Sequence, residues 1–233
     1  MRRLAFPRAL PLLVAAVALA LGGCDSATEG AGPATPRGSS PGPEDDVTRW
    51  VEAAKITPDP GALLHDTTGG PGPTTACDAV TAAGAQVGYA HTWWWADGET
   101  SYLEHFVGVY DLPGADIIDL HERRSNECPS LQYRYQGGAA ESTVSQTLAD
   151  PEVAGSDGSY AYCEKSVTLE PAEHRGEESA TCHALLSRGR VVTMVSVLGD
   201  GATYDVAIDS AKQKLATAVA LAGPALVAAV PVN

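Results

Sequence analysis

Hydrophobic and polar residues alternate between positions 86 and 111, on both sides of Asp97-Gly98. Strict alternation predicts β-strands, and Asp-Gly between two such runs predicts a tight two-residue turn. We therefore expect a β-hairpin in which the numbers of paired residues sum to 195. That register places Trp93 opposite Tyr102, His91 opposite Glu104 and Tyr89 opposite Phe106.

Apolar residues at helical spacing predict three helices, and further alternating runs predict more strands. The helices are expected at 47–55 after an Asp46 cap, at 113–126 and at 203–222; the further strands are expected at 130–136, 160–169, 179–186 and 190–198. The apolar tail 223–233 is interrupted by Pro224 and Pro231 and is too short to span a bilayer, so we expect a packed C-terminal arm there. This order of elements predicts an α+β fold, an antiparallel β-sheet with packed helices.

The N-terminus has the features of an export signal. Arg2, Arg3 and Arg8 precede an apolar run over 12–21, which is shorter than the roughly 20 residues of a membrane span. The sequence Leu21-Gly22-Gly23-Cys24 resembles the lipobox of bacterial lipoproteins, in which the cysteine receives a diacylglycerol. We expect a signal peptide over 1–23 and a lipid-anchored protein on the extracellular face of the cell membrane. A plain secretory signal with an incidental Cys24 is the alternative.

The residues after Cys24 predict a tether followed by one domain. Positions 25–46 contain no Leu, Ile, Val, Phe, Trp or Tyr, so this stretch cannot bury apolar area and we expect a disordered linker over 24–46. The remaining 47–233 is long enough for one domain. The chain carries 15 basic and 29 acidic residues, a net charge of −14. This acidity argues against nucleic acid as a partner and against docking by charge on anionic lipid.

With Cys24 lipidated, four cysteines remain, and an exported chain with an even number of cysteines predicts two disulfides. Three connectivities are possible. We favour Cys77–Cys128 with Cys163–Cys182, because each bond then closes within one half of the domain and strand pairing would place Cys163 opposite Cys182. The alternating pattern also predicts that His183 points to the other face from Cys182. The sequence has no C-x-x-C and no tight Cys/His cluster, so neither zinc nor a redox role is expected.

A lipobox, a low-complexity tether and a domain with four cysteines resemble the PknH-like extracellular sensor domain family of actinobacteria. The residues that carry the resemblance are the four cysteines, the segment 107–115 (VGVYDLPGA) and Arg188-Gly189-Arg190-Val191-Val192. The chain departs from the family in having no tryptophan between Glu122 and Glu127. The resemblance implies an antiparallel sheet with helices, two disulfides and a cleft that binds an unidentified ligand, here without an attached kinase domain.

No sequence motif of a hydrolase, nucleotide-binding or metal-binding site is present, so we expect a non-enzyme without cofactor or metal. Aromatic side chains on one hairpin face, together with a rare positive charge, are the candidates for ligand binding: Tyr89, Trp93, Trp95, Tyr102 and Arg134. The alternative for each tryptophan is packing in the core. The expected function is binding or sensing of an unidentified small ligand by a monomeric envelope lipoprotein. The alternatives are a structural or protein-interaction module of the envelope and, with least support, a cell-wall hydrolase.

Overall fold

The computed structural model describes residues 43–56, 63–68, 84–95, 102–128, 130–135 and 137–231, without the side chains of 43–46, 63–68, 87, 89, 93–95 and 135. Within these residues the alternating segments pair into one antiparallel sheet with the strand order β1-β2-β3-β8-β7-β6-β5-β4. The strands are β1 Leu63–Thr68, β2 Val87–Trp95, β3 Tyr102–Val109, β4 Leu131–Tyr135, β5 Gly138–Thr147, β6 Gly158–Glu170, β7 Glu178–Arg188 and β8 Val191–Leu198. The predicted signal peptide over 1–23, Cys24 and Cys77 lie outside the described residues.

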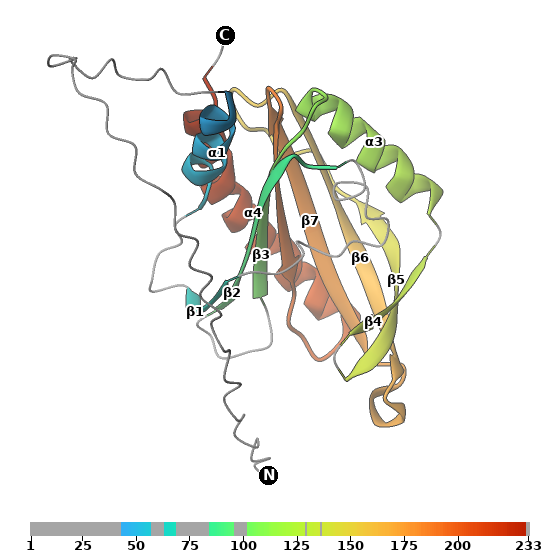
Figure 1. Cartoon of the computed structure of the whole chain (residues 1–233). Coiled ribbons are helices and arrows are strands. Elements are labelled where there is room, and N and C mark those ends of the chain that lie inside the picture. The colour runs from blue at the N-terminus through green and yellow to red at the C-terminus, as the bar shows by residue number, and fades with distance from the viewer. Residues whose placement is uncertain are drawn as a thin grey trace, which may run out of the picture. The chain divides into compact units, whose positions relative to one another are not determined.

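Helices cover the two faces of this sheet separately (Figure 1). Helices α1 (Pro43–Ala53) and α4 (Tyr204–Ala229) pack on one face, and α3 (Gly114–Glu127) packs on the other; a short 3₁₀ turn, η1 (Ala172–His174), joins β6 to β7. The α+β fold with an antiparallel sheet and packed helices is therefore confirmed. We call the two sides of the sheet the α4 face and the α3 face.

The two faces bury different side chains of the same strands. On the α4 face, Leu103, Ala184 and Val195 pack with Ala211 and Leu215 of the helix. On the α3 face, Phe106, Leu185 and Met194 pack with Ile117 and Ile118. Because both faces of the sheet are covered, the central strands β3, β8 and β7 are buried over most of their lengths.

The predicted hairpin exists, but its predicted register is wrong by one residue. Trp94, not Trp93, pairs with Tyr102, and His91 pairs with His105 instead of Glu104. The numbers of the paired residues sum to 196 rather than to the predicted 195. Because a one-residue shift exchanges the two faces, Tyr102 does not share a face with positions 89, 93 and 95.

Two helix boundaries also differ from the sequence prediction. α1 begins at Pro43, so residues 43–46 belong to the helix rather than to the linker. Proline suits the first helical position, and acidic residues in the first turn interact favourably with the helix dipole. α4 runs on to Ala229 through Pro224, so the prediction that helix ends at 222 is wrong. Pro224 and Ala220 are both exposed, so the carbonyl that loses its helical donor lies on the solvent side.

Candidate functional site

A row of polar side chains crosses four adjacent strands on the α3 face. The cross-strand pairing Glu104–Ser196–His183–Tyr162 runs over β3, β8, β7 and β6. The preceding row, Phe106–Met194–Leu185–Tyr160, is apolar at three of its four positions and packs against α3. The α3 face therefore changes from apolar to polar within one row of residues.

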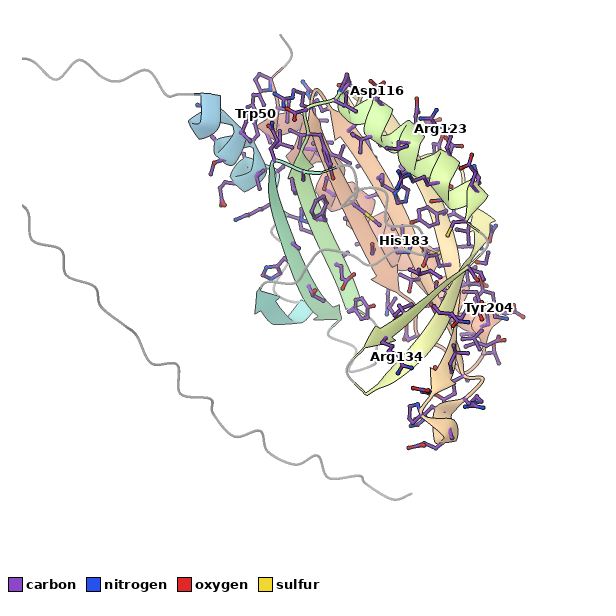
Figure 2. The ribbon with its side chains drawn as sticks, turned by 45° about the vertical axis from the view of Figure 1, so that its right-hand side comes forward. Trp50, Asp116, Arg123, Arg134, His183 and Tyr204 are labelled. Atoms are coloured by element: carbon purple, nitrogen blue, oxygen red, sulfur yellow. A yellow bond between two sulfur atoms is a disulfide. The ribbon has the colours of Figure 1, made fainter. Side chains whose placement is uncertain are left out.

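We use the name polar cluster for a defined set of six residues on this face. Four of them are buried, Glu104 and Ser166 are half-buried, and hydrogen bonds or electrostatic interactions connect members of the set; the six are Glu104, Ser142, Glu164, Ser166, His183 and Ser196. Figure 2 shows His183 in the middle of the sheet, beside the region covered by α3. Charged residues are rarely buried in this way without a partner or a function, because removing them from water is costly.

His183 is the centre of the polar cluster and is only 1% exposed. Its Nδ1 lies 2.7 Å from the hydroxyl oxygen of Ser196, and its ring stacks on Tyr162 with 4.8 Å between the ring centroids. Its Nε2 lies 3.7 Å from Oε1 of Glu164, which is an ion-pair distance but longer than a hydrogen bond. Nε2 has no hydrogen-bond partner among the described residues.

Glu164 supplies a carboxylate that is almost fully buried, with 3% of the residue exposed. The Ser142 hydroxyl donates a hydrogen bond to Oε2 of Glu164 at 2.8 Å, and the Ser166 hydroxyl donates to Ser142 at 3.1 Å. Two serines from β5 and β6 therefore orient this carboxylate beside the imidazole of His183.

Two half-buried residues mark the more accessible side of the polar cluster: Glu104, which belongs to it, and Tyr102, which lies beside it. Burial raises the pKa of the Glu104 carboxyl above its usual range, and the imidazole of His183 acts in the opposite direction. Burial also raises the pKa of the Tyr102 hydroxyl, and the neighbouring Glu104, Tyr133 and Glu164 add to that rise. Tyr133, which contributes to this rise in the pKa of Tyr102, lies on β4, the last strand in the strand order.

α3 contributes His121 to the same region. His121 is fully buried, and its Nε2 lies 2.9 Å from the Tyr162 hydroxyl. Burial lowers the pKa of His121 to about 4, with a further lowering from His183 and an opposing effect of Glu164. His121 is therefore neutral at pH 7.

Ser196, His183 and Glu164 have the residue types of a hydrolytic triad, but their geometry does not suit one. A nucleophilic serine must reach its substrate, and Ser196 is 0% exposed in the middle of β8. The arrangement instead presents buried hydrogen-bonding groups behind a half-exposed carboxyl and a tyrosine hydroxyl. Such convergent polar groups fix the orientation of a bound ligand.

The residues proposed from the sequence are divided by the structure. Tyr102 lies beside the polar cluster, whereas Arg134 is on β4 with its side chain 80% exposed and paired with Glu170 at 3.2 Å. The side chains of Tyr89, Trp93 and Trp95 lie outside the described residues, so their role in binding stays a prediction. The predicted His91–Glu104 pair does not form, because His91 pairs with His105 on β3.

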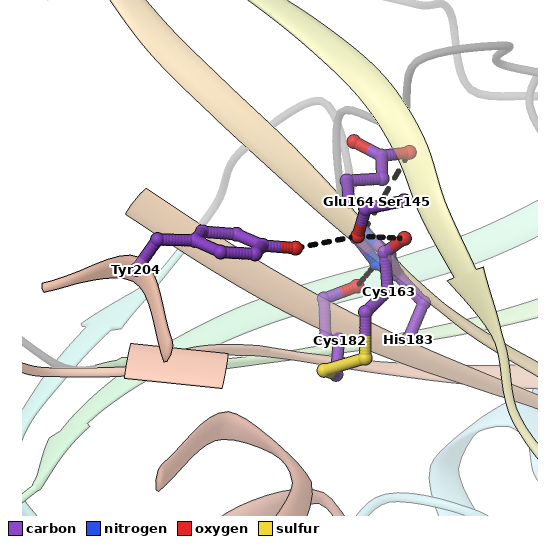
Figure 3. Close-up of a disulfide and its surroundings, with 7 residues drawn as sticks. Ser145, Cys163, Glu164, Cys182, His183 and Tyr204 are labelled. Atoms are coloured by element: carbon purple, nitrogen blue, oxygen red, sulfur yellow. Dashed lines mark hydrogen bonds and ion pairs between the residues drawn. A yellow bond between two sulfur atoms is a disulfide. The ribbon is translucent and has the colours of Figure 1, made fainter. Parts of the chain in front are cut away.

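Sequence reasoning did not identify Glu164 as a site residue. A usable signal was present, because Glu164 follows Cys163 as His183 follows Cys182, so an alternating strand carries both to the face opposite the disulfide. Figure 3 shows Glu164 on the other side of the strands from the sulfur atoms. His183 does lie on the opposite face from Cys182, as predicted.

The predicted bond between Cys163 and Cys182 is confirmed, and the two residues are direct cross-strand partners on β6 and β7. Cys128 is also disulfide-bonded. Its predicted partner Cys77 lies outside the described residues, so that pairing stays a prediction. A disulfide is typical of proteins in an oxidising, non-cytoplasmic compartment.

Among the described residues, no three His, Cys, Asp or Glu side chains are arranged to hold a metal ion. In that same part of the chain, no helix has the length and apolar character needed to cross a membrane.

Comparison with known proteins places the chain in no described family. No family model matches it, and no curated protein matches it. An X-ray structure of an uncharacterised Mycobacterium smegmatis protein, described as the Rv0999 ortholog, is similar over 69% of this chain and 87% of that chain, with 14% identity and a TM-score of 0.34. This similarity is too low to inform function, and the resemblance to the PknH-like family is not confirmed.

Proposed function

We propose that this chain is a lipoprotein, anchored through Cys24 on the extracellular face of the cell membrane, that binds a small ligand of the cell envelope without catalysis. The polar cluster is the proposed binding site. The observation that carries the proposal is the pair of carboxylates, Glu104 and Glu164, on either side of one buried imidazole.

The energetics of the polar cluster support binding over a purely structural role. Apolar residues fill the neighbouring row under α3, so the fold accommodates apolar packing on this face. Replacing buried charges with apolar residues is often neutral or stabilising, so a buried Glu–His pair is poorly explained by stability alone.

The chemistry of the polar cluster favours a neutral or cationic ligand that carries hydroxyl or ammonium groups. Carboxylates accept hydrogen bonds from such groups, whereas a second anion would be repelled in this low-dielectric environment. The net charge of −14 acts in the same direction over longer distances.

Native mass spectrometry of the full chain, purified without reductant from its own membranes, tests the proposal. We expect a co-purified mass that disappears on denaturation. Glu104→Gln removes the half-exposed carboxylate while keeping its size, and should weaken retention of that mass about tenfold, which corresponds to about 1.4 kcal/mol.

Glu173→Gln is the matched control, because Glu173 is an exposed glutamate on η1 between β6 and β7. It should retain the ligand like the unaltered chain. A bare mass for the unaltered chain, or equal retention by Glu104→Gln and the unaltered chain, would contradict the assignment of the polar cluster.

A further inference from the structure

An apolar groove runs along the outer side of α4, on the face of the sheet opposite the polar cluster. Its volume is about 680 Å³, and one wall is the segment 152–154. The residues that line it are Glu152, Val153, Ala154, Ala216, Val219, Ala220, Pro224, Val227 and Ala228.

Small residues give the groove an even floor. Ala216, Ala220, Pro224 and Ala228 are spaced four apart, so they follow one side of the helix, and all four are exposed. Gly223 allows Val153 to lie close to the helix, because a Cβ at position 223 would be 2.8 Å from Cγ1 of Val153. The wall and the helix therefore form the two sides of an open groove.

The charge distribution argues for an uncharged occupant. No charged residue occurs from Leu215 to Val230, in a chain with a net charge of −14. Among the described residues, Glu152 is the one charged residue that lines the groove. A carboxylate or phosphate monoester head group would be repelled there, whereas a neutral or zwitterionic head group would not.

The dimensions fit one alkyl chain better than a protein. From Ala216 to Ala228 the helix rises about 18 Å at 1.5 Å per residue, so the floor is long and narrow. The volume lies in the range of small-molecule pockets, about 300–1,000 Å³. The nine lining residues are far fewer than the roughly 20–30 per side of a stable protein interface.

We propose that this groove binds a single acyl chain of a lipid with a neutral or zwitterionic head group. The acyl chain lies against Ala216, Ala220 and Ala228, and the head group lies near Glu152. The assignment is independent of the polar cluster, because the sheet separates the two sites.

Photolabelling of the full chain in phosphatidylcholine vesicles tests this assignment. The probe is lysophosphatidylcholine with a diazirine in its acyl chain. Trypsin cleaves after Lys214 and releases Leu215–Asn233, which has no further Lys or Arg, as one peptide. We expect the label on this peptide, and at least tenfold less label in Ala220→Trp, whose indole fills the groove.

Thr217→Trp is the matched control, because Thr217 is exposed on α4 but does not line the groove. It should be labelled like the unaltered chain, and circular dichroism should show both variants folded. Ala228→Asp is a second test that adds no bulk, and it should also reduce labelling.

Three results would overturn the proposal. They are an unlabelled Leu215–Asn233 peptide, equal labelling of Ala220→Trp and Thr217→Trp, and stronger labelling by a diazirine fatty acid than by the zwitterionic probe. If labelling fails while Glu104→Gln still weakens retention of a co-purified mass, the proposal of an acyl-chain site in the groove is refuted and the proposal of a binding site at the polar cluster stands.

Discussion

The bond between Cys163 and Cys182 should stabilise the fold mainly by restricting the unfolded chain. The two residues are 19 positions apart. In the chain-entropy relation, a loop of this size lowers the entropy of the unfolded state by about 11 cal/mol/K, or about 3 kcal/mol at 25 °C. We therefore expect Cys163→Ala/Cys182→Ala to lower the free energy of unfolding by about 3 kcal/mol.

Urea unfolding of the full chain, followed by circular dichroism, measures this loss. The bond at Cys128 stays intact in the double variant, so the difference reports the bond between β6 and β7 alone. The dependence of the free energy on urea should also rise, because the less restricted unfolded chain exposes more surface. A loss under 1 kcal/mol would refute the loop-entropy reasoning.

The register of β6 and β7 should survive removal of this bond. A slip of one residue between these strands would carry either Glu164 or His183 onto the α4 face, against Ala211 and Leu215, and would leave a polar side chain among apolar ones. The imidazole NMR signals of His183 should therefore stay unchanged in the folded double variant. Altered signals would mean that the disulfide, rather than the side-chain pattern, sets the register.

Two further predictions concern acid stability and close packing. The pKa of His121 is about 4 in the folded protein against 6.5 in the unfolded chain. The contribution of neutral His121 to the free energy of unfolding is therefore complete above pH 6.5, and about 3 kcal/mol of it is lost as the pH falls toward 4. His121→Gln, which does not titrate, should reduce the difference in unfolding free energy between pH 7 and pH 4; an unchanged difference would assign it to other groups. Gly199→Ala should destabilise by about 3 kcal/mol or more in thermal unfolding, because a Cβ would lie 1.9 Å from the carbonyl oxygen of Ala207; an unchanged melting temperature would contradict this contact.

Elements with a strong periodic pattern could be predicted from the sequence. The strands expected at 179–186 and 190–198 are β7 and β8, and all their valines and leucines except Leu198 are buried, because both faces of the sheet are covered. The helix expected at 113–126 is α3, displaced by one residue. The bond between Cys163 and Cys182 followed from the pairing of two predicted strands.

Elements that depend on tertiary partners could not be predicted. β5 has the sequence GAAESTVSQT, which has little hydrophobic content, and it is a strand because it pairs with β6. α4 continues beyond Pro224 because Leu226 and Ala229 bury their side chains against α1 and the sheet, which outweighs the cost of the proline. Neither effect is visible in a local window of sequence.

The polar cluster was missed because its members come from five strands, which are brought together only by the pairing register of the sheet. Ser142, Glu164 and His183 are each unremarkable polar residues in their own segments. A hairpin register wrong by one residue also assigned Glu104 to His91, when its cross-strand neighbour on β8 is Ser196. Predicting such a site requires knowing, for every strand that contributes to it, which residues face which side of the sheet.

The alternation of side chains between the two faces of the sheet explains how one sheet supports two proposed sites of different chemistry. On β6 and β7, each cysteine that faces α4 is followed by a polar residue that faces the other side, so the apolar packing of α4 and the polar cluster are built from adjacent positions. The apolar groove then lies on the outer surface of that same helix. A carboxylate cluster on one face and an uncharged groove beyond the other cannot be parts of a single binding site, because the sheet stands between them. Substitutions of Glu104 and of Ala220 should therefore have additive effects on the free energy of unfolding, as expected for residues that share no partner.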